Sequence, residues 1–446
     1  MRPGPTEAEP ATVPAGATQA GETPARWAWV ERAVWTDRML TVLDQHGLKG
    51  GKWYSLVDKV HAPANLRAAF ARVKANRGSA GVDHVTVERF EARLDENLDQ
   101  LHVSLRDGTY RPQAIRRAWI PKPGSTEQRP LGIPTVRDRV VQTALRSVLE
   151  PIFERDFAEH SYGFRPGRGA KDALRRVDRL LQQGYVYVVD ADFKSYFDTI
   201  PRDRLLERVA TRVSDGRVLA LLRAYLEQGV MDGMECWTPT RGTPQGAVIS
   251  PLLSNLYLDP LDAQMAEQGF EMTRYADDFV VQCRSAAEAQ AALAEVERWT
   301  ASAGLSLHPD KTRIVDARER GGFDFLGYHF EGGHRWPRAK SLGKLKETIR
   351  AKTHRANGHS LDAIIADVNR TLRGWFEYFK HSCRTALRDV DQWVRMRLRS
   401  ILRKRRGRRG RGRGLDHLRW PNAFFDAHGL FSLYAARMAF CRPSLR

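Results

Sequence analysis

The sequence predicts an α+β fold, and three observations support it. Hydrophobic residues make up 42% of the 446 residues, enough to bury a large core in two or three domains. Short apolar runs typical of strands alternate with stretches of 3.6-residue periodicity typical of helices. From about residue 338 onward the pattern becomes helical and basic. We therefore expect a mixed body followed by a helical, basic C-terminal part.

The N-terminal part is predicted to be mostly helical. Residues 1–25 are rich in Pro, Ala, Gly and Thr and contain almost no large apolar residue, so we expect a disordered tail. We expect helices over residues 27–43, 86–105, 136–149 and 170–181, a short strand over 118–120, and turns at 78–83 and 162–167. The third helix is the clearest, because its apolar residues recur with helical spacing. These are Val136, Val140, Val141, Ala144, Leu145, Val148 and Leu149.

Strands and helices alternate in the middle of the chain. We expect strands over 186–189, 312–315 and 323–330, and helices over 202–213, 218–228 and 286–299. A glycine-bounded turn at 242–246 opens a helix that runs to about residue 265. Basic helices are predicted at 342–354, 361–381 and 385–405, and an aromatic stretch at 420–440 ends the chain.

The positive charge is concentrated at the C-terminal end. Residues 331–446 contain 28 Lys and Arg against 9 Asp and Glu, a net charge of +19, whereas residues 1–330 contain 44 of each. Residues 403–414 carry eight positive charges among their twelve positions, interrupted by glycine. We expect a flexible basic loop that orders on RNA, with a solvated charge run as the simpler alternative.

The four cysteines favour a reducing compartment. Cys236, Cys283, Cys383 and Cys441 are scattered and form no Cys-x-x-Cys motif, so neither a disulfide framework nor a zinc site is expected. No apolar run reaches the length of a membrane span, and the N-terminus shows no secretory signal pattern. We expect a cytoplasmic protein without a membrane partner.

Two short acidic segments carry the strongest functional signal. Asp192 follows a predicted buried strand, and Asp277 and Asp278 lie at the tip of a predicted hairpin. If the segments lie side by side, three carboxylates converge and repel one another unless divalent cations bind. Two Mg²⁺ ions would suit in-line phosphoryl transfer, the chemistry of a nucleic-acid polymerase.

Each acidic segment is weak evidence when taken alone. Asp-Asp is common in turns because aspartate tolerates turn geometry and bonds its own backbone. Asp190 or Asp198 could be the functional carboxylate in place of Asp192, or all could simply be solvated. The order of strand, helices and acidic hairpin favours the catalytic interpretation.

The order of the motifs resembles the bacterial group II intron-encoded reverse transcriptase/maturase family, from about residue 64 to about residue 436. The matching segments include 81–83, 108–112, 120–124, 129–139, 161–167, 192–198, 243–251, 275–278, 325–328 and 373–379. Each is modestly specific, but their order and spacing are strongly specific. The paired cysteines that many members carry in a C-terminal His-Asn-His endonuclease are missing, so we expect no such domain.

The resemblance implies a right-hand polymerase with fingers, an antiparallel-sheet palm and a helical thumb. We assign residues 1–25 to the tail, 26–180 to an N-terminal extension and fingers, and 181–330 to the palm. Residues 331–402 form the thumb/maturase domain, and 403–446 form a basic loop and C-terminal segment that binds RNA or DNA.

The resemblance also implies roles for individual residues. Asp192, Asp277 and Asp278 would be catalytic and would hold two Mg²⁺ ions. The nucleotide would contact Lys122, Arg129, Phe193, Phe197, Gln245 and Lys311, with Phe197 as the gate that rejects a ribose 2′-OH. RNA would contact Arg165, Arg395, Arg397, Arg399, Arg403, Arg405 and Arg406.

The implied activity is RNA-directed DNA synthesis from dNTPs in a mobile group II intron. The partners would be the intron RNA, the target DNA and a primer strand, and homodimer formation stays open. The protein would assist splicing and copy the RNA at the insertion site. The resemblance also implies a bacterial protein that associates with the nucleoid when it acts on DNA. The alternatives are a domesticated reverse transcriptase serving phage defence or CRISPR spacer capture, and an RNA-binding splicing cofactor without polymerisation. RNA polymerisation is disfavoured by Phe197, because template-dependent RNA polymerases usually carry a carboxylate there.

Overall fold

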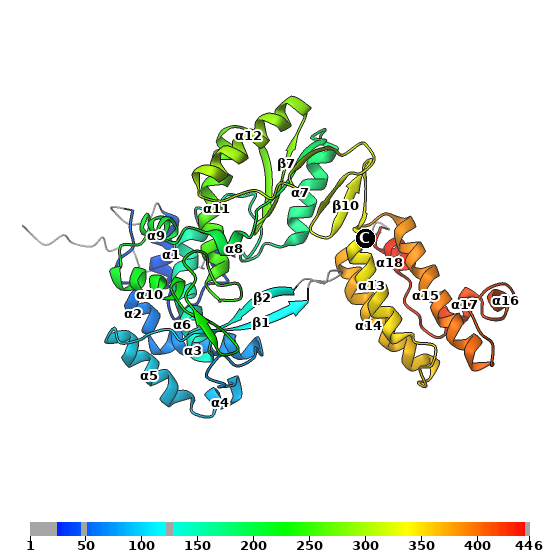
Figure 1. Ribbon diagram of the computed structural model, residues 1–446, viewed down its shortest axis with the longest axis horizontal. Coiled ribbons are helices and arrows are strands. Elements are labelled where there is room, and N and C mark those ends of the chain that lie inside the picture. The colour runs from blue at the N-terminus through cyan, green and yellow to red at the C-terminus, as the bar shows by residue number, and fades with distance from the viewer. Residues whose placement is uncertain (1–24, 46–50, 122–127, 442–446) are drawn as a thin grey trace, which may run out of the picture.

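A computed structural model describes residues 25–45, 51–121 and 128–441, and it is α+β as the sequence predicts (Figure 1). The described ranges contain three sheets, ordered β2-β1-β4-β5, β6-β7-β3-β8 and β11-β10-β9. The predicted disordered tail lies, except for residue 25, outside the described residues. Within the described ranges, no helix has the length and apolar character needed to cross a membrane.

The first sheet and the N-terminal helices form the part that we call the fingers. β1 (Ile115–Pro121) pairs antiparallel with β2 (Gln128–Ile133) and parallel with β4 (Val230–Asp232), and β4 pairs with β5 (Glu235–Trp237). The helices are η1 (Ala25–Trp27), α1 (Asp37–Asp44), α2 (Val57–His61), α3 (Pro63–Ala75), α4 (Val87–Glu91), α5 (Leu94–Arg106) and α6 (Val136–Glu154). α6 is almost wholly buried because α2 and α3 pack against it. The single helix predicted over 86–105 is in fact two, α4 and α5.

The second sheet is the palm, and all of its pairings are antiparallel. β3 (Tyr187–Asp192) lies between β7 (Asp278–Cys283) and β8 (Arg313–Asp316), and β6 (Glu271–Tyr275) is at the edge. Because side chains alternate along a strand, the two faces of the sheet pack on different helices. Val189 and Val281 join the core shared with α11 (Ser250–Glu267) and α12 (Ala286–Ser302), whereas Val188 and Val280 pack with α7 (Ala170–Gln182). Three helices follow β3 in the chain: α8 (Tyr196–Thr199), α9 (Arg202–Ala210) and α10 (Gly216–Leu226).

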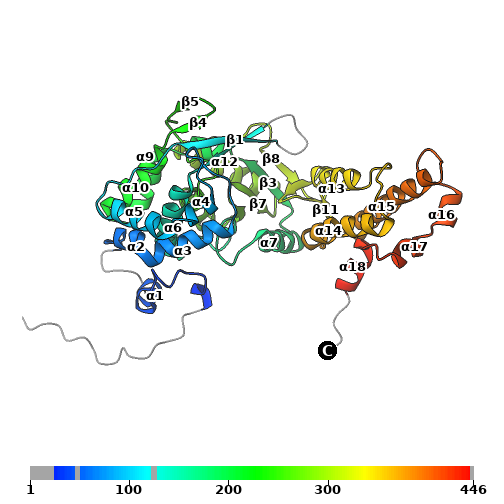
Figure 2. The same cartoon turned by 90° about the horizontal axis from the view of Figure 1, so that it is seen from below.

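The thumb extends away from the palm as a row of helices (Figure 2). The strands β9 (Phe323–Phe325), β10 (Tyr328–Glu331) and β11 (His334–Pro337) lead into it. Its long helices are α13 (Ala339–Lys352), α14 (Leu361–Phe379) and α15 (Arg384–Arg405), close to the three predicted ranges. Three short helices follow: α16 (Leu415–Arg419), α17 (Asn422–Ala427) and α18 (Leu433–Phe440). The thumb has an apolar core of its own, which runs from Leu345 to Leu433.

The predicted strand over 323–330 is two strands, because Leu326 and Gly327 form a turn with φ of 46° and 84°.

Two predicted domain boundaries, after residues 180 and 330, separate elements that pack together in the structure. The third sheet continues past residue 331 into β11, and α7, which crosses residue 181, packs on the palm sheet. The assignment of residues to fingers, palm and thumb remains a prediction.

Candidate active site

The acidic centre lies where β3 ends and β7 begins. Asp192, the last residue of β3, stands opposite Asp278, the first residue of β7, in the antiparallel register. Residues directly opposite each other in such a pair have Cα atoms about 4.5–5.5 Å apart. Asp277 immediately precedes Asp278, in the turn between β6 and β7. The structure therefore brings together the three carboxylates that the sequence places about eighty residues apart.

A buried arginine holds this turn in place. Ala276 has a left-handed backbone with φ of 59°, which is unusual for a residue with a side chain. The carbonyl of Ala276 accepts a hydrogen bond of 2.9 Å from Nη1 of Arg274. The same guanidinium donates to Asn255 at 3.0 Å and forms an ion pair with Asp262. Arg274 is fully buried, so these acceptors fix both its position and the backbone of the turn.

A glycine allows a second segment to pack against the turn. A Cβ atom on Gly163 would lie well inside van der Waals contact of the backbone nitrogen of Ala276. The neighbouring Tyr162 donates its backbone N–H to Arg274 O at 2.9 Å, and Gly163 O accepts from Asn255 at 2.8 Å. The loop predicted at 162–167 therefore supports the acidic hairpin directly.

The carboxylates interact strongly with one another. Part of the Asp278 side chain is exposed, yet its surroundings restrict its hydration. This restricted hydration, together with the charges of Asp277, Asp192 and Asp190, raises the pKa of Asp278 to about 7. Burial, opposed by a backbone hydrogen bond, and the charge of Asp192 also raise the pKa of Asp277. The centre therefore carries negative charge that its own surroundings neutralise only in part.

This donor set fits Mg²⁺ in chemistry, although it is not yet arranged around one point. Carboxylate oxygens are the hard ligands that Mg²⁺ prefers, and the raised pKa values mark a place where a cation is favourable. Among the described residues, no group of three or more His, Cys, Asp or Glu side chains is already positioned to hold a metal ion. The side chain of Lys311 instead lies 2.5 Å from Asp192. Binding would require Asp192 to exchange this partner for the metal.

The two other candidate carboxylates have different surroundings. Asp190 stands opposite Arg313 in the register of β3 and β8, and the two form an ion pair of 3.3 Å. Asp198 lies in α8 and lines a cavity away from the acidic turn. Of the three candidates near the end of β3, Asp192 is the one that faces Asp278.

The predicted triphosphate cations are partly described. Arg129 is exposed on β2, and its positive charge opposes the rise in the pKa of Asp277. Arg129 therefore lies on the side of the fingers that faces the acidic centre. Lys122 lies outside the described residues. Lys311 is in the acidic centre, where it pairs with Asp192.

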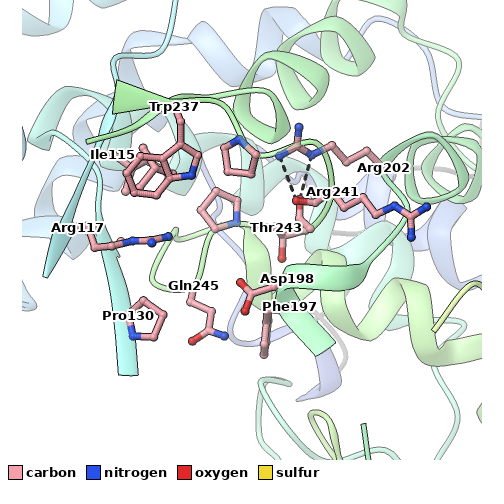
Figure 3. Close-up of a pocket in the computed structure, with 15 residues that line it drawn as sticks. Ile115, Arg117, Pro130, Phe197, Asp198, Arg202, Trp237, Arg241, Thr243 and Gln245 are labelled. Atoms are coloured by element: carbon pink, nitrogen blue, oxygen red, sulfur yellow. Dashed lines mark hydrogen bonds between the residues drawn. The ribbon is translucent and has the colours of Figure 1, made fainter. Parts of the chain in front are cut away.

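Phe197 and Gln245 lie together in a cavity of about 320 Å³ between fingers and palm (Figure 3). Gly132 of β2 donates its backbone N–H to Gln245 O at 2.6 Å. Gly246 has φ of +101°, and a Cβ atom there would collide with the backbone oxygen of Gly132. The close approach of these two backbones holds the predicted gate and the predicted sugar contact at the junction of the two parts.

Phe193 does not lie at this cavity. Its side chain is 4% exposed and packs against Tyr196 and Phe279, with ring centroids 5.4 and 5.2 Å away. Because side chains alternate along a strand, the residue after Asp192 points into the core. We therefore replace its predicted nucleotide contact with a packing role.

Arg165 is also a structural residue. Its side chain is 2% exposed and forms an ion pair of 2.8 Å with Glu154. It also donates to the carbonyls of Ala158 and Ser161. Its guanidinium is enclosed by these acceptors and cannot reach a template phosphate, contrary to the predicted RNA contact.

Most of the predicted RNA-binding arginines of the thumb are bonded within the thumb. Arg399 is buried and donates to Trp420 O and Asn422 Oδ1 at 2.9 and 2.8 Å. The other internal contacts are Arg395 with Asp426 at 3.3 Å, Arg397 with Thr353 O at 2.8 Å and Arg403 with Asp416 at 2.6 Å. These four tie α15 to its neighbours, and their RNA role stays a prediction.

Two of the predicted RNA contacts remain accessible at the end of α15. Arg405 is exposed and donates to the carbonyl of His359. Arg406 is exposed, with its guanidinium 5.6 Å from the ring centroid of Trp420. The exposed stretch that follows α15 lies next to both.

Several residues of the site were missed from the sequence. Arg274, Asn255, Asp262 and Gly163 support the acidic turn, and the charge of Arg338 acts on Asp278 to lower its pKa. An arginine within the strand that leads to the acidic hairpin was the available signal, because a charge buried there needs a partner.

Comparison with known proteins places this geometry in context. Residues 120–330 match the family "Reverse transcriptase (RNA-dependent DNA polymerase)", and residues 342–420 match "Group II intron, maturase-specific domain". The chain is 35% identical to Protein YkfC of Escherichia coli (strain K12) over 327 residues, which are 64% of this chain and 84% of that protein. It is 36% identical to group II intron-encoded protein LtrA of Lactococcus lactis subsp. cremoris over 196 residues, 44% of this chain but 32% of LtrA. Among solved structures, a chain of a partial Cas6-RT-Cas1–Cas2 complex is 25% identical, with a TM-score of 0.36 over 55% of this chain and 42% of that one.

Proposed function

We propose a function on the premise that the chain belongs to the reverse transcriptase/maturase family of group II introns. The protein is an RNA-directed DNA polymerase that binds its intron RNA, assists splicing and copies that RNA into DNA at the insertion site from a primer strand. The observation that carries the proposal is the register of Asp192 with Asp278 beside Asp277, in a chain that also has a maturase thumb.

Each residue of the acidic centre would have its own role in DNA synthesis. Asp192, Asp277 and Asp278 would hold two Mg²⁺ ions, which when bound stabilise the charge that develops on the attacking and leaving oxygens. Arg129 would hold phosphate oxygens of the incoming dNTP, since it lies close enough to act on Asp277. Lys311 would release Asp192 and become free to meet the leaving pyrophosphate.

Selection of the sugar would fall to the cavity at the junction of fingers and palm. The ring of Phe197 lies at this cavity beside Gln245, so a 2′-OH on the incoming nucleotide would meet the ring (Figure 3). Gln245 is positioned through its own backbone by Gly132, which leaves its side-chain amide free to contact the sugar. The geometry therefore favours dNTPs over ribonucleotides.

Primer extension tests the proposal. The full chain, an RNA template and an annealed DNA primer should yield full-length DNA when dNTPs and Mg²⁺ are present, and none after chelation of the metal. Splicing of an RNA that contains the chain's own intron should accelerate when the protein is added. Splicing assistance without any primer extension would replace the proposal by the splicing-cofactor alternative.

A further inference from the structure

A basic groove lies on the side of the palm–thumb junction that faces away from the fingers sheet. α7, β11, the first turn of α15 and α18 enclose a space of about 930 Å³. In Figure 2, α7 and α18 lie along the lower side of the molecule, whereas β1 and α13 lie along the upper side. The groove is thus separate from the cavity that contains Phe197 and Gln245.

Arginines dominate the walls of this groove. Arg335, Arg384, Arg388 and Arg437 line it, and its carboxylates are Asp178 and Asp389. Arg335 already pairs with Asp178. Arg384 and Arg388 are exposed, and neither forms an ion pair with a residue in the described part of the chain. They are one helical turn apart on α15, about 6 Å along its axis.

The two carboxylates of the groove do not neutralise its positive charge. Burial, together with the charges of Arg335, Arg437, Lys380 and Arg175, lowers the pKa of His381 on the groove wall to about 4. The Nε of Arg437 is buried and has no hydrogen-bond partner in the described part of the protein. The side chain of Cys383 does not cap α15, so the first turn of that helix adds a positive partial charge.

We propose that this groove binds the phosphate backbone of a folded RNA, while the carboxylate side of the molecule holds primer and template. The inference rests on the proposed function in that it takes RNA as the polyanion. Arginine forks suit phosphate oxygens, and two guanidinium groups at one-turn spacing, neither of them in an ion pair within the described residues, offer a row of such contacts. The guanidinium of Arg388 lies 4.9 Å from the ring centroid of Tyr434. Arg384 and Arg388 also lie within residues 342–420, the part that matches the maturase-specific domain.

The test compares two pairs of neutralised arginines in the full chain. Arg384→Gln/Arg388→Gln removes the two exposed groove cations that form no ion pair within the described residues, and Arg67→Gln/Arg223→Gln removes two cations from exposed ion pairs on α3 and α10. The probe is an RNA hairpin with a stem of about 20 base pairs and no primer terminus, measured by fluorescence anisotropy at about 0.15 M salt. We expect the groove variant to bind the hairpin about tenfold more weakly and to lose roughly two from its log–log salt slope. The control pair should bind like the wild type.

The readouts separate this inference from the polymerase proposal. The KM for an annealed primer–template should be unchanged in the groove variant, because the primer binds on the other side. A wild-type protein that fails to extend primers but shows the arginine-dependent hairpin binding would overturn the polymerase and leave the groove. Equal hairpin affinities of the groove variant and the wild type would overturn the groove.

A second variant guards against misfolding as the cause of weak binding. Ala386→Glu places a carboxylate on the groove wall and removes no contact of the thumb core. It should weaken hairpin binding by a similar factor with an unchanged melting temperature. A poly-glutamate peptide tests the other occupant: if it binds the wild type but not the groove variant while hairpin binding persists in both, the groove serves an acidic protein and the RNA assignment is overturned.

Discussion

The ammonium nitrogen of Lys311 lies 2.5 Å from Oδ2 of Asp192, the carboxylate that faces Asp278 across β3 and β7. A cation of the chain itself therefore partly neutralises the acidic centre. The pair is accessible, with side chains 56% and 37% exposed, so water screens it and it is easily exchanged. In the proposed mechanism, Mg²⁺ would compete with Lys311 for this carboxylate oxygen.

Removal of this competitor should tighten metal binding. An exposed ion pair contributes less than about 1 kcal/mol, so Lys311→Met should lower the Kd for Mg²⁺, in the absence of nucleotide, by at most roughly fivefold. Isothermal titration of the two proteins measures the difference. A weaker affinity in the variant would show that Lys311 helps to organise the site and does not compete for it.

Asp277→Asn should abolish DNA synthesis while RNA binding persists. Loss of a metal ligand removes several kcal/mol of transition-state stabilisation, so we expect a fall in kcat on the order of a thousandfold. The matched control is Asp203→Asn, which changes an exposed carboxylate paired with Arg223 on the outside of α9. Equal losses of synthesis and RNA binding would contradict the assignment of Asp277 to the metal site.

Mg²⁺ should stabilise the protein more at pH 8 than at pH 6. The folded-state pKa of Asp278, about 7, lies above its ordinary value of 3.8, so the folded protein holds a proton that the unfolded chain releases. The stability of the metal-free protein therefore falls as the pH rises from about 4 to 7. Above pH 7 the ionised carboxylate is free to bind Mg²⁺, which offsets this loss. Melting temperatures with and without Mg²⁺ at both pH values measure the effect, and the difference between pH values should shrink in Asp278→Asn.

Phe197→Ala should admit ribonucleotides. Removal of the ring opens the cavity beside Gln245, and the preference for dNTPs should fall on the order of tenfold to a hundredfold in kcat/KM. Phe193→Leu is the control, because Phe193 packs in the core beneath the same strand end. That change should lower stability and keep the preference, and an unchanged preference in Phe197→Ala would refute the gate.

The role of Arg274 in shaping the acidic turn can be separated from its contribution to the stability of the fold. Arg274→Met leaves Asp262 buried without its partner and should cost about 3–5 kcal/mol of unfolding free energy. Arg274→Met/Asp262→Leu should recover much of that loss, because no buried charge remains uncompensated. Polymerisation should stay impaired in the double variant, since Ala276 O still lacks its donor. Denaturant unfolding and primer extension together test this, and recovery of both would mean that the turn holds its shape without Arg274.

The three long helices of the thumb were predictable because their apolar residues recur with clear helical spacing over a long stretch. α14 and α15 were expected at 361–381 and 385–405 and begin at Leu361 and Arg384. α13 begins at Ala339, three residues before its predicted start. The acidic hairpin was predictable too, since the apolar run Phe279–Val281 follows the acidic pair and Met272 precedes it.

Short strands were harder to predict. β2 contains Pro130 and Gly132, both typical of loops, yet it pairs along six positions with β1 because a neighbouring strand supplies the hydrogen bonds. β4 and β5 have three residues each, too few for any periodicity to appear. Tertiary pairing, which a local pattern does not contain, decides these segments.

The arginines of α15 show why the RNA contacts could not be predicted from the sequence alone. Charge along the sequence locates a basic region, but it does not reveal which guanidinium groups already have acceptors. Arg399 reaches a carbonyl twenty-one positions away, whereas Arg384 on the same helix forms no ion pair within the described residues. Folded geometry separates the two, and it moves the expected RNA contacts from the middle of α15 to its ends.

The independent apolar core of α13 to α18 has a practical meaning for protein engineering. These helices bury most of their apolar side chains among themselves, but Phe379 of α14 packs in the core that contains Val188 and Val280 of the palm sheet. A graft of α13 to α18 between related polymerases would therefore have to carry matching residues at this contact. The grip on the copied strand, and with it the length of DNA made per encounter, would then be adjustable as a property distinct from turnover.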